Sequence, residues 1–138
     1  MSAIRQQISI AAAVRTVWRA LTTNDGLTSW WVDEARVDAR AGGTVTLTAE
    51  DDDGNPREER GIFHSIVPTR KIEIHWDQGS PAPTCGSRIQ FSLARDRGET
   101  RLSVIHSGGD VGDDEELHDL LEKEWRQSLF ALRSYLED

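Results

Sequence analysis

The sequence is short of several residue types, and each shortage excludes a class of protein. Its single cysteine, Cys85, excludes an internal disulfide and agrees with a reducing compartment. No apolar run approaches the roughly 18 residues that span a bilayer, and the segment after Met1 lacks the apolar stretch of a signal peptide. We therefore expect a cytoplasmic protein without membrane insertion.

Basic residues are also few. Lys and Arg together number 16 against 24 acidic residues, which gives a formal net charge of -8. This excess repels phosphate backbones and leaves no basic stripe, so we expect no nucleic-acid partner. Solubility alone accounts for the acidity.

Sequence motifs of familiar chemistry are missing. The chain has no Gly-x-Ser-x-Gly elbow, no phosphate-binding glycine loop and no dinucleotide fingerprint. The acidic segment 51–54 could suggest a calcium loop, but the matching register puts Ala49 and Arg60 where carboxylates are needed, so it predicts a hairpin turn instead. The histidines have no zinc-type spacing: His64, His75, His106 and His118. We expect no metal, no cofactor and no assignable catalytic residue.

What the sequence does have is the patterning of one α+β domain over residues 1–138. The hydrophobic share of 37% and charged share of 29% suit a globular chain of this length. Two short helices are predicted after the first strand, the second of them following a turn at 24–26. Period-two alternation predicts strands at residues 4–10, 35–39, 44–50, 60–67, 70–77, 89–93 and 102–106.

A long amphipathic helix is predicted to close the chain over residues 113–136. Its apolar positions recur at steps of three or four, and its acidic start suits the positive end of the helix dipole. At 1.5 Å per residue it is roughly 35 Å long. We predict an α+β fold in which a curved antiparallel sheet of six to seven strands wraps around this C-terminal helix and leaves space between them.

Aromatic side chains are the candidates to line that space. Trp76 and Trp125 lie on the sheet and helix faces expected to oppose each other, where they either wall a cavity or fill the core. Trp30 and Trp31 are adjacent, so one of them is expected to be exposed. His106 shares the inward phase of its strand, either as a hydrogen-bonded core histidine or as a functional one. The predicted ligand-binding residues are Trp30, Trp31, Phe63, Trp76, Phe91, His106, Leu121 and Trp125.

Several stretches carry a family resemblance: residues 17–22 (Val-Trp-Arg-Ala-Leu-Thr), 27–31 (Leu-Thr-Ser-Trp-Trp), 61–63 (Gly-Ile-Phe) and 124–136 in the closing helix. With these, the chain resembles the activator of heat-shock protein 90 ATPase homologue-like family, within the START-like or SRPBCC superfamily. The resemblance implies a helix-grip fold, often with an apolar cavity, and a link to the stress response. The superfamily includes lipid and hormone carriers, polyketide cyclases and other enzymes, so the fold alone selects no activity.

The leading hypothesis is non-catalytic binding of a small, largely apolar molecule between sheet and C-terminal helix, with His106 orienting it. One alternative is a cavity enzyme of the polyketide cyclase or hydrolase kind, in which His106 or a nearby acid moves a proton. The other is an interaction module, associated with a chaperone or forming a homodimer through an exposed Trp30 or Trp31.

Overall fold

The computed structural model describes residues 3–51 and 53–137, which form one seven-stranded antiparallel sheet and three α-helices. The elements in chain order are β1 (Ile4–Ile10), α1 (Val14–Thr22), α2 (Asn24–Trp30), β2 (Glu34–Val37), β3 (Thr44–Glu50), β4 (Pro56–Val67), β5 (Lys71–Trp76), β6 (Arg88–Asp96), β7 (Glu99–Ser107), the short 3-10 helix η1 (Gly109–Val111) and α3 (Glu115–Glu137). The strand order is β1-β7-β6-β5-β4-β3-β2. This arrangement confirms the predicted helix-grip α+β fold.

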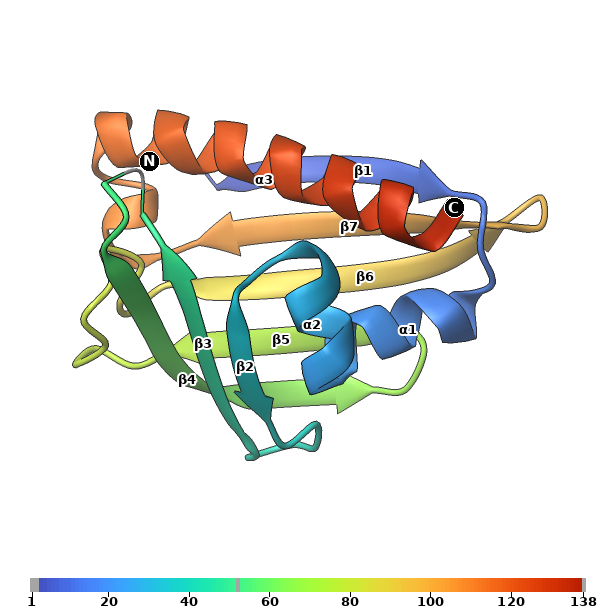
Figure 1. Cartoon of the computed structure of the whole chain (residues 1–138), viewed down its shortest axis with the longest axis horizontal. Coiled ribbons are helices and arrows are strands. Elements are labelled where there is room, and N and C mark those ends of the chain that lie inside the picture. Colours follow the sequence, from blue (N-terminus) through green and yellow to red (C-terminus); the bar gives the residue numbers. More distant parts are fainter. Residues whose placement is uncertain (1–2, 52, 138) are drawn as a thin grey trace.

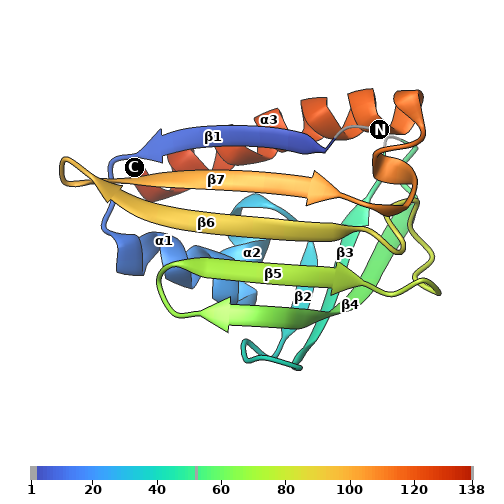
Figure 2. The same ribbon diagram turned by 180° about the vertical axis from the view of Figure 1, so that it is seen from behind.

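The helices cover one face of the curved sheet (Figure 1), and the reverse view shows the strands in front of them (Figure 2). Strand β5 shows how the sequence builds these two faces. Ile72, Ile74 and Trp76 are buried in the core, whereas the alternate residues Glu73 and His75 are partly exposed. The period-two pattern therefore separates a core face from a face without helices.

Helix α3 begins as its acidic start predicts. The Asp114 carboxylate accepts a hydrogen bond from the Leu117 N–H at 3.2 Å, which satisfies one orphan amide of the first turn. Leu121, Trp125, Leu129 and Leu132 form its buried face. Among the described residues, no helix is long and apolar enough to cross a membrane.

The turn predicted at residues 24–26 is wrong, because these residues form the first turn of α2. The Thr23 hydroxyl caps this helix by accepting from the Gly26 N–H at 3.0 Å. A Cβ atom on Gly26 would lie 2.5 Å from the Arg19 carbonyl oxygen. The glycine thus permits close packing of α2 on α1 and does not mark a turn.

Strand β4 begins at Pro56, earlier than the predicted start at residue 60, because it pairs with β3 as far as Glu50. The Asp51 carboxylate closes the turn before it by accepting two backbone N–H groups. Asp52 of the predicted turn lies outside the described residues. The longer strand carries additional charged residues onto the sheet.

Candidate functional site

A pocket of about 180 Å³ lies between α3 and the hairpin of β3 and β4; we call it the helix-hairpin pocket. Its lining consists of Trp31, Val32, Ala49, Glu50, Arg57, Glu59, Thr84, Ile89, His106, Leu121, Glu124, Trp125, Gln127 and Ser128. The predicted liners Trp31, His106, Leu121 and Trp125 are among them. Trp30, Phe63, Trp76 and Phe91 are not.

Aromatic rings in contact form one wall of the pocket. The ring centroids of Trp31 and Trp125 are 5.2 Å apart, and Phe91 meets both indoles edge-on from within the core. Trp30 stacks on Trp31 at 5.3 Å, and its indole N–H donates to the Ala20 carbonyl at 2.9 Å. The expectation that one of the adjacent tryptophans is exposed is therefore wrong: Trp30 is 7% exposed and Trp31 is half-buried.

Phe63 and Trp76 are buried in the core and do not reach the pocket. Both lie on the inward face of their strands, as predicted. Strand phase decides which face a side chain occupies, but it does not decide how near that side chain comes to α3. These two aromatic residues therefore fill the core and give the pocket no surface.

His106 is held in a chain of buried hydrogen bonds at the back of the pocket. The Trp125 indole N–H, which can only donate, bonds to Nδ1 of His106 at 3.0 Å. Nδ1 is then the acceptor, so the neutral ring carries its proton on Nε2 and donates to the Ser87 hydroxyl at 2.9 Å. The Ser87 hydroxyl donates onward to the Thr84 carbonyl at 2.6 Å.

Burial lowers the pKa of His106 to about 4, because desolvation penalises the charged imidazolium. The ring is therefore neutral at pH 7, and both nitrogens have protein partners. We conclude that His106 positions Trp125 and the loop around Thr84.

Glu59 is an acidic group of the pocket whose pKa is also displaced. Burial of its carboxyl group raises the pKa, while the hydrogen bond from the Thr84 hydroxyl and the positive charge of Arg57 lower it in part. Glu124 adds a smaller upward effect through charge repulsion. The residue as a whole keeps some solvent exposure even though protein atoms crowd its carboxyl group. A carboxyl group in such a setting can accept a hydrogen bond from a ligand when it is ionised and can donate one when it is protonated.

An ion pair joins the two sides of the pocket. The Arg57 guanidinium on β4 lies 3.3 Å from the Glu124 carboxylate on α3, and both side chains are partly exposed. Both residues line the pocket. Arg57 and Glu124 thus form a polar bridge between hairpin and helix.

Arg57, Glu59 and Thr84 were not among the residues predicted from the sequence. A signal for Glu59 was present, since it shares the strand phase of Gly61 and Phe63, and a carboxylate in the inward phase of a strand is unusual. Because the predicted strand began at residue 60, Glu59 lay outside it and its inward position was not recognised. Thr84 lies in a loop, where no periodicity could have placed it.

Groups that could share a metal ion lie away from the pocket. Among the described residues, two sets have ligand atoms close enough together: His64, Glu73 and His75, and His118, Asp119 and Glu122. None of these six lines the pocket. The features of the pocket that could bind a ligand are therefore its hydrogen-bonding groups and its aromatic wall.

Comparison with solved structures finds the same fold over nearly the whole chain. A protein of Nitrosomonas europaea has a TM-score of 0.81 at 22% identity, covering 98% of this chain and 94% of its own. The solution structure of the Aha1 dimer from Colwellia psychrerythraea has a TM-score of 0.79 at 24% identity, covering 99% and 97%. CalU16 of Micromonospora echinospora has a TM-score of 0.76 at 22% identity, covering 97% and 75%.

No curated protein gives a significant match. The family model described as "Activator of Hsp90 ATPase homolog 1-like protein" matches residues 11–137. That match includes α1 to α3 and every strand except β1. The chain therefore belongs to the activator of Hsp90 ATPase homolog 1-like family.

Proposed function

We propose that the helix-hairpin pocket binds a small amphipathic molecule with an apolar body and a cationic or hydrogen-bond-donating head group. The observation that carries the proposal is the pairing, in one pocket, of an aromatic wall at Trp31 and Trp125 with the crowded carboxyl group of Glu59. Apolar pockets with a few convergent polar groups are the usual form of small-molecule sites.

The charge of the lining selects the head group. Glu50, Glu59 and Glu124 are acidic, whereas Arg57 is the basic side chain of the lining and is already paired with Glu124. A cation or neutral donor would complement this excess of acid, and an anion would be repelled. The proposal thus refines the hypothesis of a largely apolar ligand.

The volume sets an upper size. At about 180 Å³ the pocket is smaller than the roughly 300–1,000 Å³ of sites that enclose drug-sized ligands. A single ring with a short polar arm is a suitable probe. 2-Phenylethylamine, 2-phenylethanol and phenylacetate provide cationic, neutral and anionic versions of nearly the same shape.

The test is a titration of each probe followed by tryptophan fluorescence, because Trp31 and Trp125 line the pocket. We expect saturable binding of the amine, weaker binding of the alcohol and weakest binding of phenylacetate. Native mass spectrometry of freshly purified protein would show any retained natural ligand. Failure of all three probes to saturate, with no retained molecule, would refute the proposal.

Glu59→Gln is the diagnostic variant, because it removes the carboxylate while keeping an acceptor for Thr84. We expect it to weaken amine binding by at least about tenfold, which corresponds to roughly 1.4 kcal/mol for a lost charge-assisted bond. Glu58→Gln is the matched control, since it makes the same change one residue away on the strand and outside the pocket lining. Equal losses in both variants would point to a general charge effect.

A second candidate, acid-base catalysis in the same pocket, is favoured by the raised pKa of Glu59. Such a carboxyl group is better suited than His106 to act as a general acid, because both ring nitrogens of His106 are hydrogen-bonded to other side chains. Any molecule recovered by native mass spectrometry can be incubated with fresh protein and its mass followed. Conversion that stops in Glu59→Gln would favour an enzyme, and an unchanged mass would favour a binding protein.

A second copy of the chain is the partner that the comparisons support best, because the Colwellia protein was solved as a dimer. Trp30 is too buried to supply such a contact, whereas Trp31 is half-buried. Light scattering would report the mass in solution. A chaperone partner rests on the family name alone and stays a prediction.

A further inference from the structure

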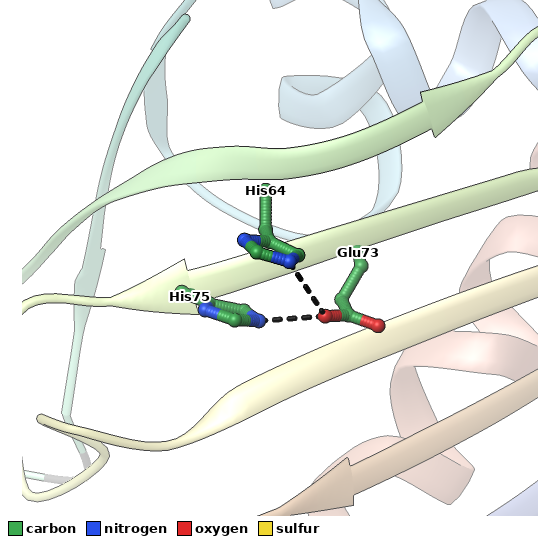
Figure 3. A group of neighbouring side chains, drawn as sticks. All are labelled: His64, Glu73 and His75. Atoms are coloured by element: carbon green, nitrogen blue, oxygen red, sulfur yellow. Dashed lines mark hydrogen bonds and ion pairs between the residues drawn. The ribbon is translucent and has the colours of Figure 1, made fainter. Parts of the chain in front are cut away.

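We propose that the helix-free face of the sheet carries a binding site for a divalent transition metal, formed by His64, Glu73 and His75. The three residues come from β4 and β5 and lie together on that face (Figure 3). This site is separate from the helix-hairpin pocket, so the two proposals stand or fall independently.

His64 lies at a β-bulge in β4. Along β4, Phe63 pairs with Ile74 and Ser65 pairs with Glu73, so His64 is an extra residue without a ladder partner. Phe63 is buried and His64 is exposed. The extra residue lets β4 present two successive side chains away from the core, a common way for a sheet to redirect a functional side chain.

The ligand atoms already converge on one carboxylate oxygen. Nε2 of His75 lies 2.7 Å from Oε2 of Glu73, and Nε2 of His64 lies 3.9 Å from the same oxygen. One ligand atom from each residue can be chosen so that all three lie within 4.8 Å of one another. Tetrahedral zinc with ligand bonds of about 2.0–2.1 Å requires separations of about 3.3 Å, so side-chain adjustment alone can close the site.

The two imidazoles are arranged for that adjustment. Their rings stack in parallel with centroids 4.1 Å apart and an interplanar angle of 5°. The His64 side chain is 56% exposed, so it can tilt toward a shared ion without displacing the core. Alternation along β5 places Glu73 and His75 on the same face, and their backbone is fixed by pairing on both sides. The sheet therefore supplies two rigidly mounted ligands and one adjustable ligand.

The donor set selects the class of metal. Two imidazole nitrogens and one carboxylate suit zinc and related first-row divalent ions, whereas magnesium and calcium prefer all-oxygen sites. Three protein ligands at a surface leave at least one coordination position for water or another molecule.

The second group, at His118, Asp119 and Glu122 on α3, is the less suitable one. It has a single imidazole, and the Asp119 side chain is 72% exposed. It provides a matched control for nonspecific binding by a histidine beside carboxylates.

The test is calorimetric titration of zinc chloride into untagged protein that has been dialysed against a chelator. We expect saturable binding of one ion per chain. His64→Ala and His75→Ala should each weaken it by at least about tenfold, since even loss of an outer-shell partner costs 10–100-fold in affinity. His118→Ala should leave the affinity unchanged.

Circular dichroism would check that the variants fold, and a second measurement needs no variant at all. Nitrogen NMR of the wild-type protein should show zinc-induced shifts of the Nε2 resonances of His64 and His75. Absence of saturable binding would overturn the proposal. So would binding that survives both substitutions, binding lost in His118→Ala alone, or unshifted ring nitrogens.

Discussion

The imidazole of His106 is held between two hydrogen-bonding partners, an indole N–H on one side and the Ser87 hydroxyl on the other. Protonation of the ring would put a second proton on Nδ1, where the Trp125 N–H already points. It would also place a charge on a buried ring, which is costly. The lowered pKa therefore follows from burial, which disfavours the charged ring.

This residue predicts how stability depends on pH. His106 has a folded pKa of about 4 against an ordinary value of 6.5, so below 6.5 the unfolded chain takes up a proton that the folded chain does not. Its contribution should be complete above pH 6.5 and should be lost progressively as the pH falls toward 4. The slope is at most about 1.4 kcal/mol per pH unit for one group. Urea denaturation across this range would measure it.

His106→Asn isolates the effect, because its amide cannot titrate. The variant should be less stable at pH 7, since the buried network is disturbed, but its stability should fall less between pH 6.5 and 4.5 than that of the wild type. The comparison matters because the raised pKa of Glu59 acts with the opposite sign, adding stability as the pH falls. An NMR titration in which His106 changes charge near pH 6.5 would contradict this account.

The same residue shows where sequence reasoning stops. Alternation with Leu102 and Val104 put His106 on the inward face, where the structure finds it. Its partner Ser87 lies in the loop before β6, and no local pattern links that loop to a strand 19 residues away. Sequence periodicity thus gives the side chain's face but leaves its hydrogen-bond partners unknown.

Helices and strands could be predicted from the sequence where local residue patterns determine them. The buried apolar face of α3 and the alternation of buried and exposed residues in β5 follow from the periodicity of the sequence alone, and both are observed. The start of α2 depends on how Gly26 packs against α1, which is a tertiary contact, and the turn predicted there was wrong. The early start of β4 likewise depends on its pairing with β3.

The close packing of α2 on α1 at Gly26 leads to a testable prediction. Gly26→Ala would place a Cβ atom 2.5 Å from the Arg19 carbonyl oxygen and 2.7 Å from Cα of Ala20. Both are backbone atoms, so they cannot move away without a shift of α1. We expect a loss of about 1–3 kcal/mol in the free energy of unfolding, typical of overpacking. Chemical denaturation would measure it.

Gly79→Ala is the control, because nothing lies within 4 Å of a Cβ atom at Gly79. Its effect should stay within about 0.5 kcal/mol. If Gly26→Ala were equally harmless, α2 would have to move freely against α1. The stacked pair at its end, Trp30 and Trp31, would then be a less rigid wall for the pocket than we propose.

At the scale of the whole molecule, the pocket lies where two parts of the sheet meet. Strands β1, β7, β6 and β5 run roughly parallel to α3, whereas the β3–β4 hairpin and β2 turn across them at one end of the sheet (Figure 1). The Arg57–Glu124 pair spans from the hairpin to the helix beside the pocket. We infer that this pair acts as a latch that limits how far the hairpin can move from α3.

Arg57→Gln tests the latch. Because both charges are partly exposed, stability should change by no more than about 1 kcal/mol. Stopped-flow fluorescence with 2-phenylethylamine should show both association and dissociation faster by several-fold, since an open hairpin eases entry and exit alike. A purely electrostatic role for Arg57 would instead speed association of the cation and slow its dissociation.

The two rate constants therefore separate a moving latch from a fixed charge. Arg101→Gln is the control, because it breaks an exposed pair with Asp96 on the β6–β7 hairpin, outside the pocket lining. That variant should leave both rates unchanged. Hydrogen exchange supplies a measurement without any ligand: amides at the ends of β3 and β4 should exchange faster in Arg57→Gln than in Arg101→Gln. Unaltered exchange there, with unaltered rates, would mean that packing alone holds the hairpin against α3.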